Sequence, residues 1–370
     1  MQLRRRPQVM TVGGAIVAMA LSLAACSSSS SSSPGTGSSG SSAPSSGSSS
    51  SSAALSGTLN GSGSSFQNTY QLAAIQGFKS VQSGITVNYN SVGSGTGRSN
   101  LAAGTVNFAG SDSPIPAKEA SEFAGKTVLY FPVVIGPITL SYNLSGVSNL
   151  KLDPTVIAKI FQGEITKWND PAIAADNPGV SLPGTAITTA VRSDSSGTTQ
   201  NFSLFLQTAV PSVWKLGSSS TIKWPSSARA GAQNTGVASI IKSTSGAIGY
   251  VDYSTAKASG LSYASVKNSA GNFVAPSPTS ASASAAGVNV KPDLTFAAAW
   301  GSGAQAYPIT YQSWVLVYAT QPNASDAAML QAYLTYLLGD GQQLLSNLGY
   351  APLPSNIDTM AKAQISKITG

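Results

Sequence analysis

The sequence has no histidine, one cysteine and few charges, and each shortage removes a class of function. Without histidine among its 370 residues, the chain cannot form a Ser-His-Asp triad or a histidine-based zinc site. Its single cysteine, Cys26, allows neither an intrachain disulfide nor a thiolate metal cluster. Only 9% of the residues are charged. The net charge is +7, but the basic residues do not form a stripe interleaved with aromatic residues. We therefore expect no catalytic residue, no metal, no cofactor and no nucleic-acid partner.

The N-terminus has the pattern of an export signal. Residues 1–10 are basic, residues 11–23 are apolar but too few to span a membrane in the mature chain, and LAAC ends the pattern at Cys26. Small residues before a cysteine resemble a lipobox, which predicts a lipoprotein signal peptide over residues 1–25 and diacylation of Cys26. An ordinary signal peptide that contains a cysteine is the alternative. Lipidation would hold the chain on the outer face of the cytoplasmic membrane.

A serine-rich segment separates this signal from the folded part. Residues 27–54 contain 18 serines among 28 positions, which predicts a flexible tether over residues 26–56. The remaining chain is too long for one compact core and suggests two lobes. Its short apolar runs alternate with helical stretches, a pattern that favours an α/β fold.

Four polar loops each follow an expected strand. They are GSGSSF (61–66), GSGTG (93–97), SD (111–112) and RSDSSGTT (192–199). Glycines let backbone N–H groups approach a ligand, and the N-terminus of a following helix favours an anion. Arg192 would add a planar fork suited to an oxyanion. Each loop alone is equally typical of a turn or a helix cap, and a lysine-activated serine nucleophile at Ser195 or Ser196 stays an enzymatic alternative.

Seven segments, in order, resemble the PstS family, the phosphate-binding proteins of the bacterial phosphate ABC importer. They are GSGSSF, NYNSVGSGTG, VNFAGSDSPI, PVVIGPITLSYNL, FQGEITKWNDPAI, VRSDSSGTT and GAIGYVDY. The resemblance extends from about residue 57 to the end. It implies a two-lobed periplasmic-binding-protein fold of type II, in which each lobe is a mixed sheet flanked by helices and the ligand lies in the cleft. The first lobe would comprise 57–134 plus 304–370, and the second 135–303.

The resemblance also implies the residues of a phosphate site. They are Ser65, Phe66, Ser94, Asp112, Arg192, Ser196, Gly197 and Thr198, with Asp194 behind Arg192 as its partner. Ser65 stands where the family usually has threonine. FQGEITKWNDPAI receives no ligand, because Trp168 is expected to pack in the second lobe and Glu164 to face solvent. We expect Arg98, just past the second loop, to be a solvated helix residue.

The implied function is capture of inorganic phosphate and its delivery to the permease and ATPase of an ABC importer. Phosphate keeps at least one O–H at neutral pH, and an ionised Asp112 can accept that hydrogen. Sulfate has no hydrogen to give, so its oxygen would face a carboxylate. The alternatives are a binder of sulfate or molybdate, a surface phosphatase on the same fold, and a lipid-anchored adhesin or phosphate sensor.

Overall fold

The computed structural model describes residues 55–370. The expected signal peptide (1–25), Cys26 and nearly all of the expected tether (26–56) lie outside the described residues. Within 55–370, none of the helices combines the length and the hydropathy that crossing a membrane requires.

One mixed sheet of nine strands runs through the described residues, in the order β2-β1-β3-β12-β4-β8-β6-β7, with β9 beside β4. Its strands are β1 (Gly57–Gly63), β2 (Ile85–Ser91), β3 (Phe108–Ser111), β4 (Val128–Tyr142), β6 (Thr188–Arg192), β7 (Arg229–Gly231), β8 (Ala247–Asp252), β9 (Ser262–Tyr263) and β12 (Thr310–Tyr318). A second, smaller sheet has the order β11-β10-β5 and contains β5 (Lys151–Leu152), β10 (Ser265–Lys267) and β11 (Phe273–Val274).

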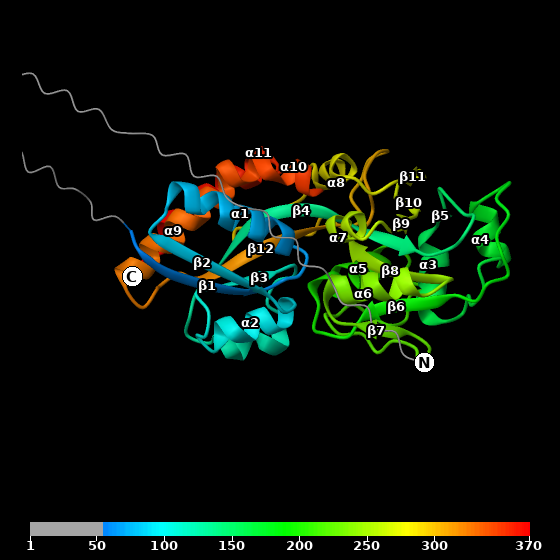
Figure 1. Cartoon of the computed structure of the whole chain (residues 1–370), viewed down its shortest axis with the longest axis horizontal. Helices are drawn as coiled ribbons and strands as arrows, with labels where there is room; N and C mark the ends of the chain where they lie inside the picture. Colours follow the sequence, from blue (N-terminus) through cyan, green and yellow to red (C-terminus); the bar gives the residue numbers. More distant parts are fainter. Residues whose placement is uncertain (1–54) are drawn as a thin grey trace, which may run out of the picture. The chain divides into compact units, whose positions relative to one another are not determined.

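The apolar strand β4 joins the two halves of the large sheet. It pairs with β12 from Val128 to Pro137 and with β8 from Ile138 to Tyr142, antiparallel in both cases. Figure 1 shows β4 passing from the strands β1, β2, β3 and β12 to the strands β6, β7 and β8. We call these two groups, with their helices, the first and the second lobe. The boundaries at 134/135 and 303/304 stay predictions, because the two lobes share a continuous sheet.

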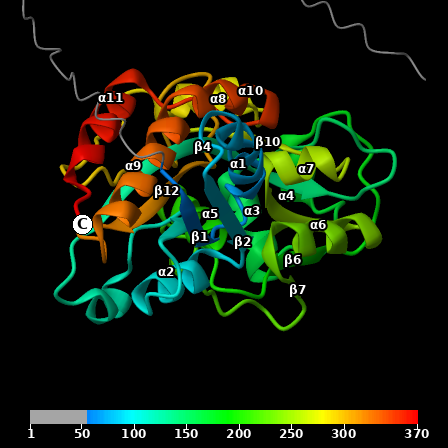
Figure 2. The same ribbon diagram turned by 60° about the vertical axis from the view of Figure 1, so that its left-hand side comes forward.

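Helices cover both lobes. Those that follow β1, β2, β3 and β12 in the chain are α1 (Asn68–Val81), α2 (Ser94–Ala102), α9 (Ala324–Leu338), α10 (Leu345–Leu348) and α11 (Ser355–Gln364), with the 3₁₀ helices η1 (Ala117–Phe123), η2 (Asp340–Leu344) and η3 (Ile365–Lys367). Those between β4 and β12 are α3 (Pro154–Gln162), α4 (Pro171–Asp176), α5 (Gly197–Ala209), α6 (Gln233–Ser243), α7 (Tyr253–Ala258) and α8 (Pro278–Ala285). Figures 1 and 2 show α1 and α9 on one side of β1 and β2, and α2 on the other.

The direction of the strands determines where the polar loops lie. In the first lobe, β1 is parallel to β2 and β3, and in the second lobe, β6 is parallel to β7 and β8. The carboxyl ends of parallel strands meet at one edge of a sheet, where ligands of open α/β sheets bind. The four polar loops follow β1, β2, β3 and β6. Because the pairings β3–β12, β12–β4 and β4–β8 are antiparallel, β3 and β6 run in opposite directions, and the carboxyl ends of the parallel strands in the two lobes face each other.

The segment FQGEITKWNDPAI packs in the second lobe, as predicted. Helix α3 before it begins at the N-cap Asp153, whose carboxylate accepts the Thr155 N–H at 2.7 Å. Trp168 is fully buried, and its indole N–H donates to the carbonyl of Gly246 at 2.9 Å. Glu164 is exposed. These contacts explain the segment without a ligand.

The expectation that Arg98 is solvated is wrong. Its guanidinium is fully buried and pairs with Glu119 of η1, with Nε 2.6 Å and Nη2 3.1 Å from the two carboxylate oxygens. Nη1 donates to the hydroxyls of Ser111 at 2.9 Å and Ser113 at 3.2 Å. Arg98 thus ties α2 to η1 and to the end of β3, a structural role that depends on a carboxylate 21 residues away.

Candidate functional site

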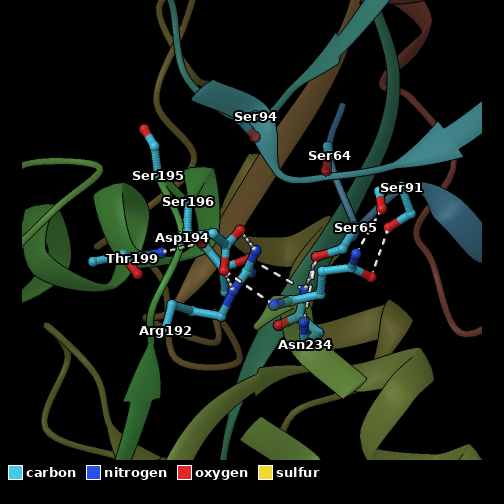
Figure 3. Close-up of polar contacts among 12 residues, drawn as sticks. Ser64, Ser65, Ser91, Ser94, Arg192, Asp194, Ser195, Ser196, Thr199 and Asn234 are labelled. Carbon is cyan, nitrogen blue, oxygen red and sulfur yellow. Dashed lines mark hydrogen bonds and ion pairs between the residues drawn. The ribbon is translucent and has the colours of Figure 1, made fainter. Parts of the chain in front are cut away.

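The polar loops of the two lobes are in direct contact. The Gly95 N–H of the first lobe donates to the carbonyl of Ser195 at 3.0 Å, and Gly197, the first residue of α5, packs against the first lobe. A Cβ at this position would lie 2.6 Å from both the Cβ of Asp112 and the Oγ of Ser94, closer than side chains pack. Glycine therefore lets the start of α5 reach the ends of β2 and β3. Figure 3 shows Ser64 and Ser94 of the first lobe facing Arg192, Asp194 and Ser196 of the second.

The first-lobe side of the site is a carboxylate surrounded by hydroxyls, here called the Asp112 cluster (Asp112, Ser64, Ser94 and Ser313). Oδ1 of Asp112 accepts from the hydroxyls of Ser64 and, at 2.5 Å, Ser313. Oδ2 accepts from Ser94 at 3.2 Å, its one hydrogen bond to the described residues. Oδ2 also points at α5, since a Cβ on Gly197 would lie 2.7 Å from it. One long hydrogen bond leaves this oxygen with capacity to accept another.

The electrostatic setting of Asp112 follows from its burial. The residue is 1% exposed. Desolvation raises the pKa of Asp112 to about 6, although the hydrogen bonds from Ser313 and Ser64 and the charge of Arg192 act in the opposite direction. Asp112 is therefore mainly ionised at neutral pH, but its proton affinity is well above that of an ordinary aspartate.

The second-lobe side of the site is the anion loop, residues 192–198, between β6 and α5. Ser196 is the N-cap of α5, and its Oγ accepts the Thr199 N–H at 3.1 Å. The N–H groups of Gly197 and Thr198 belong to the first turn of the helix, where backbone donors have no intrahelical partner. These donors and the helix dipole favour an anion at this end of α5.

Arg192 is held by Asp194 two residues later. Nε donates to Oδ1 at 2.8 Å, Nη2 donates to Oδ2, and the arginine side chain is 1% exposed. Burial tends to raise the pKa of Asp194, but the hydrogen bonds and the charge of Arg192, together with the Gln233 N–H, outweigh it and lower the pKa. The third nitrogen, Nη1, donates to the hydroxyl of Thr198 at 3.3 Å. Asp194 thus stays ionised and fixes the plane of the guanidinium.

The remaining two expected site residues come from the loop after β1. The Phe66 ring packs on Tyr311, with 4.0 Å between ring centroids, and its backbone N–H donates to the Oγ of Ser64 at 3.0 Å. The hydroxyl of Ser65 makes no hydrogen bond to Asp112 and accepts from the Asn234 amide at 3.1 Å. The structure therefore brings Ser94, Asp112 and Gly197 into direct contact, and it joins Ser65 to the second lobe through Asn234.

Three residues of the site were not predicted from the sequence: Ser64, Ser313 and Asn234. Ser64 lies inside a motif that was recognised, so its place beside Ser65 was the available signal. Asn234 follows β7, which has three residues and no apolar pattern. Ser313 lies within β12, 201 residues from Asp112, and nothing local marks it as a site residue.

Comparison with known proteins first defines the class. Residues 48–341 match the PBP superfamily domain. Phosphate-binding protein PstS 3 of Mycobacterium leprae is 36% identical over 325 residues, which cover 83% of this chain and 86% of that protein. Phosphate-binding protein PstS of Xylella fastidiosa is 36% identical over 281 residues, which cover 74% and 76%. The chain belongs to the PstS family of phosphate-binding proteins, which confirms the predicted family.

Solved structures agree on the fold. The phosphate-binding protein from Stenotrophomonas maltophilia has a TM-score of 0.65 at 20% identity, covering 83% of this chain and 93% of that one. A high-affinity periplasmic phosphate-binding protein bound with phosphate has a TM-score of 0.68 at 22% identity, covering 83% and 94%. The predicted two-lobed α/β fold is confirmed.

Proposed function

We propose that this chain binds inorganic phosphate between the Asp112 cluster and the anion loop, and delivers it to the permease and ATPase of a phosphate ABC importer. One observation carries the proposal. A buried carboxylate oxygen with spare acceptor capacity, Oδ2 of Asp112, points at the N-terminus of α5 beside an arginine, and the two sides come from different lobes. A ligand there needs an anionic body and one hydrogen to donate, and phosphate at neutral pH has both.

Each side of the site has a separate task in this proposal. The anion loop supplies donors, from the guanidinium of Arg192, the Ser196 and Thr198 hydroxyls and the first N–H groups of α5. Ser65 adds a hydroxyl donor from the first lobe. The Phe66 N–H and the Ser94 hydroxyl, which donate to Ser64 and Asp112 here, would exchange these partners for the ligand. Asp194 holds the guanidinium and offsets its charge, so neutral dipoles do much of the binding. Asp112 is the acceptor for the phosphate hydrogen.

Discrimination against sulfate or molybdate follows from the same acceptor. A fully ionised oxyanion would place an oxygen against the Asp112 carboxylate in a buried site, without a hydrogen between them. A like-charge juxtaposition of this kind costs about 2–5 kcal/mol. Phosphate and arsenate both keep a hydrogen near neutral pH, so Asp112 separates them from sulfate but not from each other.

Calorimetric titration of the purified protein, stripped of endogenous phosphate, tests the proposal. Phosphate and arsenate should bind with 1:1 stoichiometry, and sulfate should bind at least about tenfold more weakly. Sulfate binding as tight as that of phosphate would favour the alternative of a general oxyanion binder. No heat and no change in melting temperature with either anion would refute the proposal.

We also propose that the protein is anchored by lipid at Cys26 on the outer face of the cytoplasmic membrane. The support is the lipobox pattern of residues 23–26 and the serine-rich composition of the segment after it. Cys26→Ala should move the protein out of the membrane fraction while phosphate binding persists. A Cys26→Ala protein that stays wholly with membranes after a carbonate wash would contradict the anchor.

The proposed role is binding and not catalysis. The sequence offers no histidine as a base for Ser195 or Ser196, and residues 55–370 contain no group of three or more acidic or cysteine side chains placed to hold a metal. Turnover of a chromogenic phosphate ester by the metal-supplemented protein would support the phosphatase alternative. We expect no turnover above the uncatalysed rate.

A further inference from the structure

Asn234 connects one proposed phosphate ligand of each lobe. It lies in the first turn of α6, is fully buried, and donates through Nδ2 to the Oγ of Ser65 at 3.1 Å and to the Oγ1 of Thr198 at 3.3 Å. Ser65 belongs to the first lobe and Thr198 to the anion loop of the second. Figure 3 shows the Asn234 amide beside Ser65, with Arg192 next to them.

The orientation of the Asn234 amide is determined by the backbone. Its Oδ1 accepts the N–H of Asp252, the last residue of β8, at 3.3 Å. A backbone N–H can only donate, so the amide oxygen must face Asp252 and the NH₂ group must face the two hydroxyls. The preceding residue, Gln233, has the unusual φ of 59° and bonds Asp194 through its N–H at 3.0 Å and the Ser91 carbonyl through its side chain at 2.6 Å. This strained backbone persists because contacts on both sides hold it.

Each of these two hydroxyls has both acceptor positions occupied, so only its hydrogen is left to form a further hydrogen bond. A hydroxyl has two acceptor positions and one hydrogen. The Oγ of Ser65 also accepts the Asn234 backbone N–H at 3.4 Å, and the Oγ1 of Thr198 also accepts Nη1 of Arg192 at 3.3 Å. Both acceptor positions of each oxygen therefore face N–H groups. Within residues 55–370 neither hydroxyl donates a hydrogen bond of good geometry to a protein acceptor, although the Thr198 hydroxyl lies close to that of Tyr311, which is buried and has no other partner there. Each hydroxyl hydrogen is therefore available to a ligand oxygen.

We propose that Asn234 is a positioning residue that holds the Ser65 and Thr198 hydroxyls as hydrogen-bond donors to phosphate oxygens, one from each lobe. The inference rests on the proposed function. A hydroxyl that can rotate is able to donate or accept, and it must be ordered when the ligand binds. Hydroxyls ordered in advance bind acceptor oxygens more tightly and leave Asp112 as the acceptor for the ligand hydrogen.

A double-mutant cycle on the full protein, read by calorimetry with inorganic phosphate, tests this role. Asn234→Ala should weaken phosphate binding about tenfold in the wild-type background. In a Ser65→Ala, Thr198→Val background, where the hydroxyls are absent, the same change should cost less than about twofold. A residue that only supports the fold would cost the same factor in both backgrounds.

Melting temperatures of the phosphate-free proteins separate folding from positioning. The matched control is Asn177→Ala, which removes a buried asparagine whose side chain bonds the backbone of Lys151 and Ile173 away from the site. It should lower the melting temperature and leave phosphate affinity unchanged. If Asn234→Ala does not fold, Asn234→Ser replaces it in the cycle, because the short serine side chain cannot reach both the Ser65 and the Thr198 hydroxyl.

The possible results separate the positioning role of Asn234 from the proposed phosphate binding itself. Equal losses in both backgrounds, or an Asn234→Ala protein with wild-type affinity, would overturn the positioning role while phosphate binding stands. Wild-type protein that binds no phosphate would overturn the proposed function and this inference with it.

Discussion

The two carboxylates of the candidate site, Asp112 and Asp194, differ in the direction of their pKa shifts. Asp112 lies among three serine hydroxyls, and burial raises its pKa to about 6. Asp194 lies against the guanidinium of Arg192, and its pKa is lowered despite burial. The opposite directions of the two pKa shifts follow from the hydrogen-bond partners, which are serine hydroxyls for Asp112 and the Arg192 guanidinium for Asp194.

This difference assigns different tasks to the two side chains. Asp194 spends both oxygens on Arg192, so it orients the donor and is not available to a ligand. Asp112 has one oxygen with a single long hydrogen bond, and that oxygen points at the anion loop. Two titratable groups whose environments move their pKa values apart commonly take opposite roles in one site.

The largest expected effect is on the pH dependence of stability. The native pKa of Asp112, about 6, exceeds its ordinary value of 3.8, so the native state binds more protons than the unfolded state between these pH values. The group's contribution is complete below about pH 4 and is lost as pH rises through 6. Relative to Asp112→Asn, the phosphate-free wild type should therefore lose about 3 kcal/mol of unfolding free energy from pH 3 to pH 7. Urea denaturation measures this, and parallel pH profiles would contradict it.

The next largest effect is expected when the positive charge of Arg192 is removed. Arg192→Ala should weaken phosphate binding by about 2 kcal/mol or more, because a charge-assisted contact is lost and Asp194 is left unpaired near the anion. Arg229→Ala is the matched control, since it removes an exposed arginine from β7 of the same lobe and should leave affinity nearly unchanged. Calorimetry measures both. Equal affinities of the Arg192→Ala and Arg229→Ala proteins would place the ligand elsewhere.

The smallest effect is expected for Asp194→Asn. The change frees the guanidinium to move, which weakens binding, and removes a negative charge near the anion, which strengthens it. We expect phosphate affinity to stay within about 1 kcal/mol of wild type. A loss as large as that of Arg192→Ala would mean that Asp194 does more than hold its partner.

The sequence identified loops that come together where each loop follows a recognisable strand. Ser94, Asp112 and Arg192 come at or just after the ends of β2, β3 and β6, whose short apolar or alternating runs are visible in the chain. The carboxyl ends of parallel strands explain why the loops after β2 and β3 lie together, and the opposite direction of β6 turns its loop toward them. The α/β class was predictable from the alternation of apolar runs and helical stretches, and the two lobes from the chain length and the family resemblance.

The sequence was insufficient where a role depends on a distant contact. The sequence gives Arg98 the pattern of a surface residue of α2. In the structure Arg98 is buried because it pairs with Glu119 of η1. Ser313 reaches Asp112 because β12 returns to pair with β3 and β4, a long-range pairing that no local pattern encodes. Asn234 gains its contacts from two loops of different lobes.

The most direct test of the account is the anion selectivity of Asp112→Asn. If Asp112 accepts the phosphate hydrogen, the amide oxygen of asparagine can still accept it, so phosphate should keep part of its affinity. Sulfate should gain, because the carboxylate charge is gone and an N–H can face its oxygen. The phosphate-to-sulfate affinity ratio should fall about tenfold to a hundredfold, equivalent to about 1.4–2.8 kcal/mol. Competition titrations at fixed pH and ionic strength measure the ratio, and an unchanged ratio in a folded protein would contradict the role of Asp112.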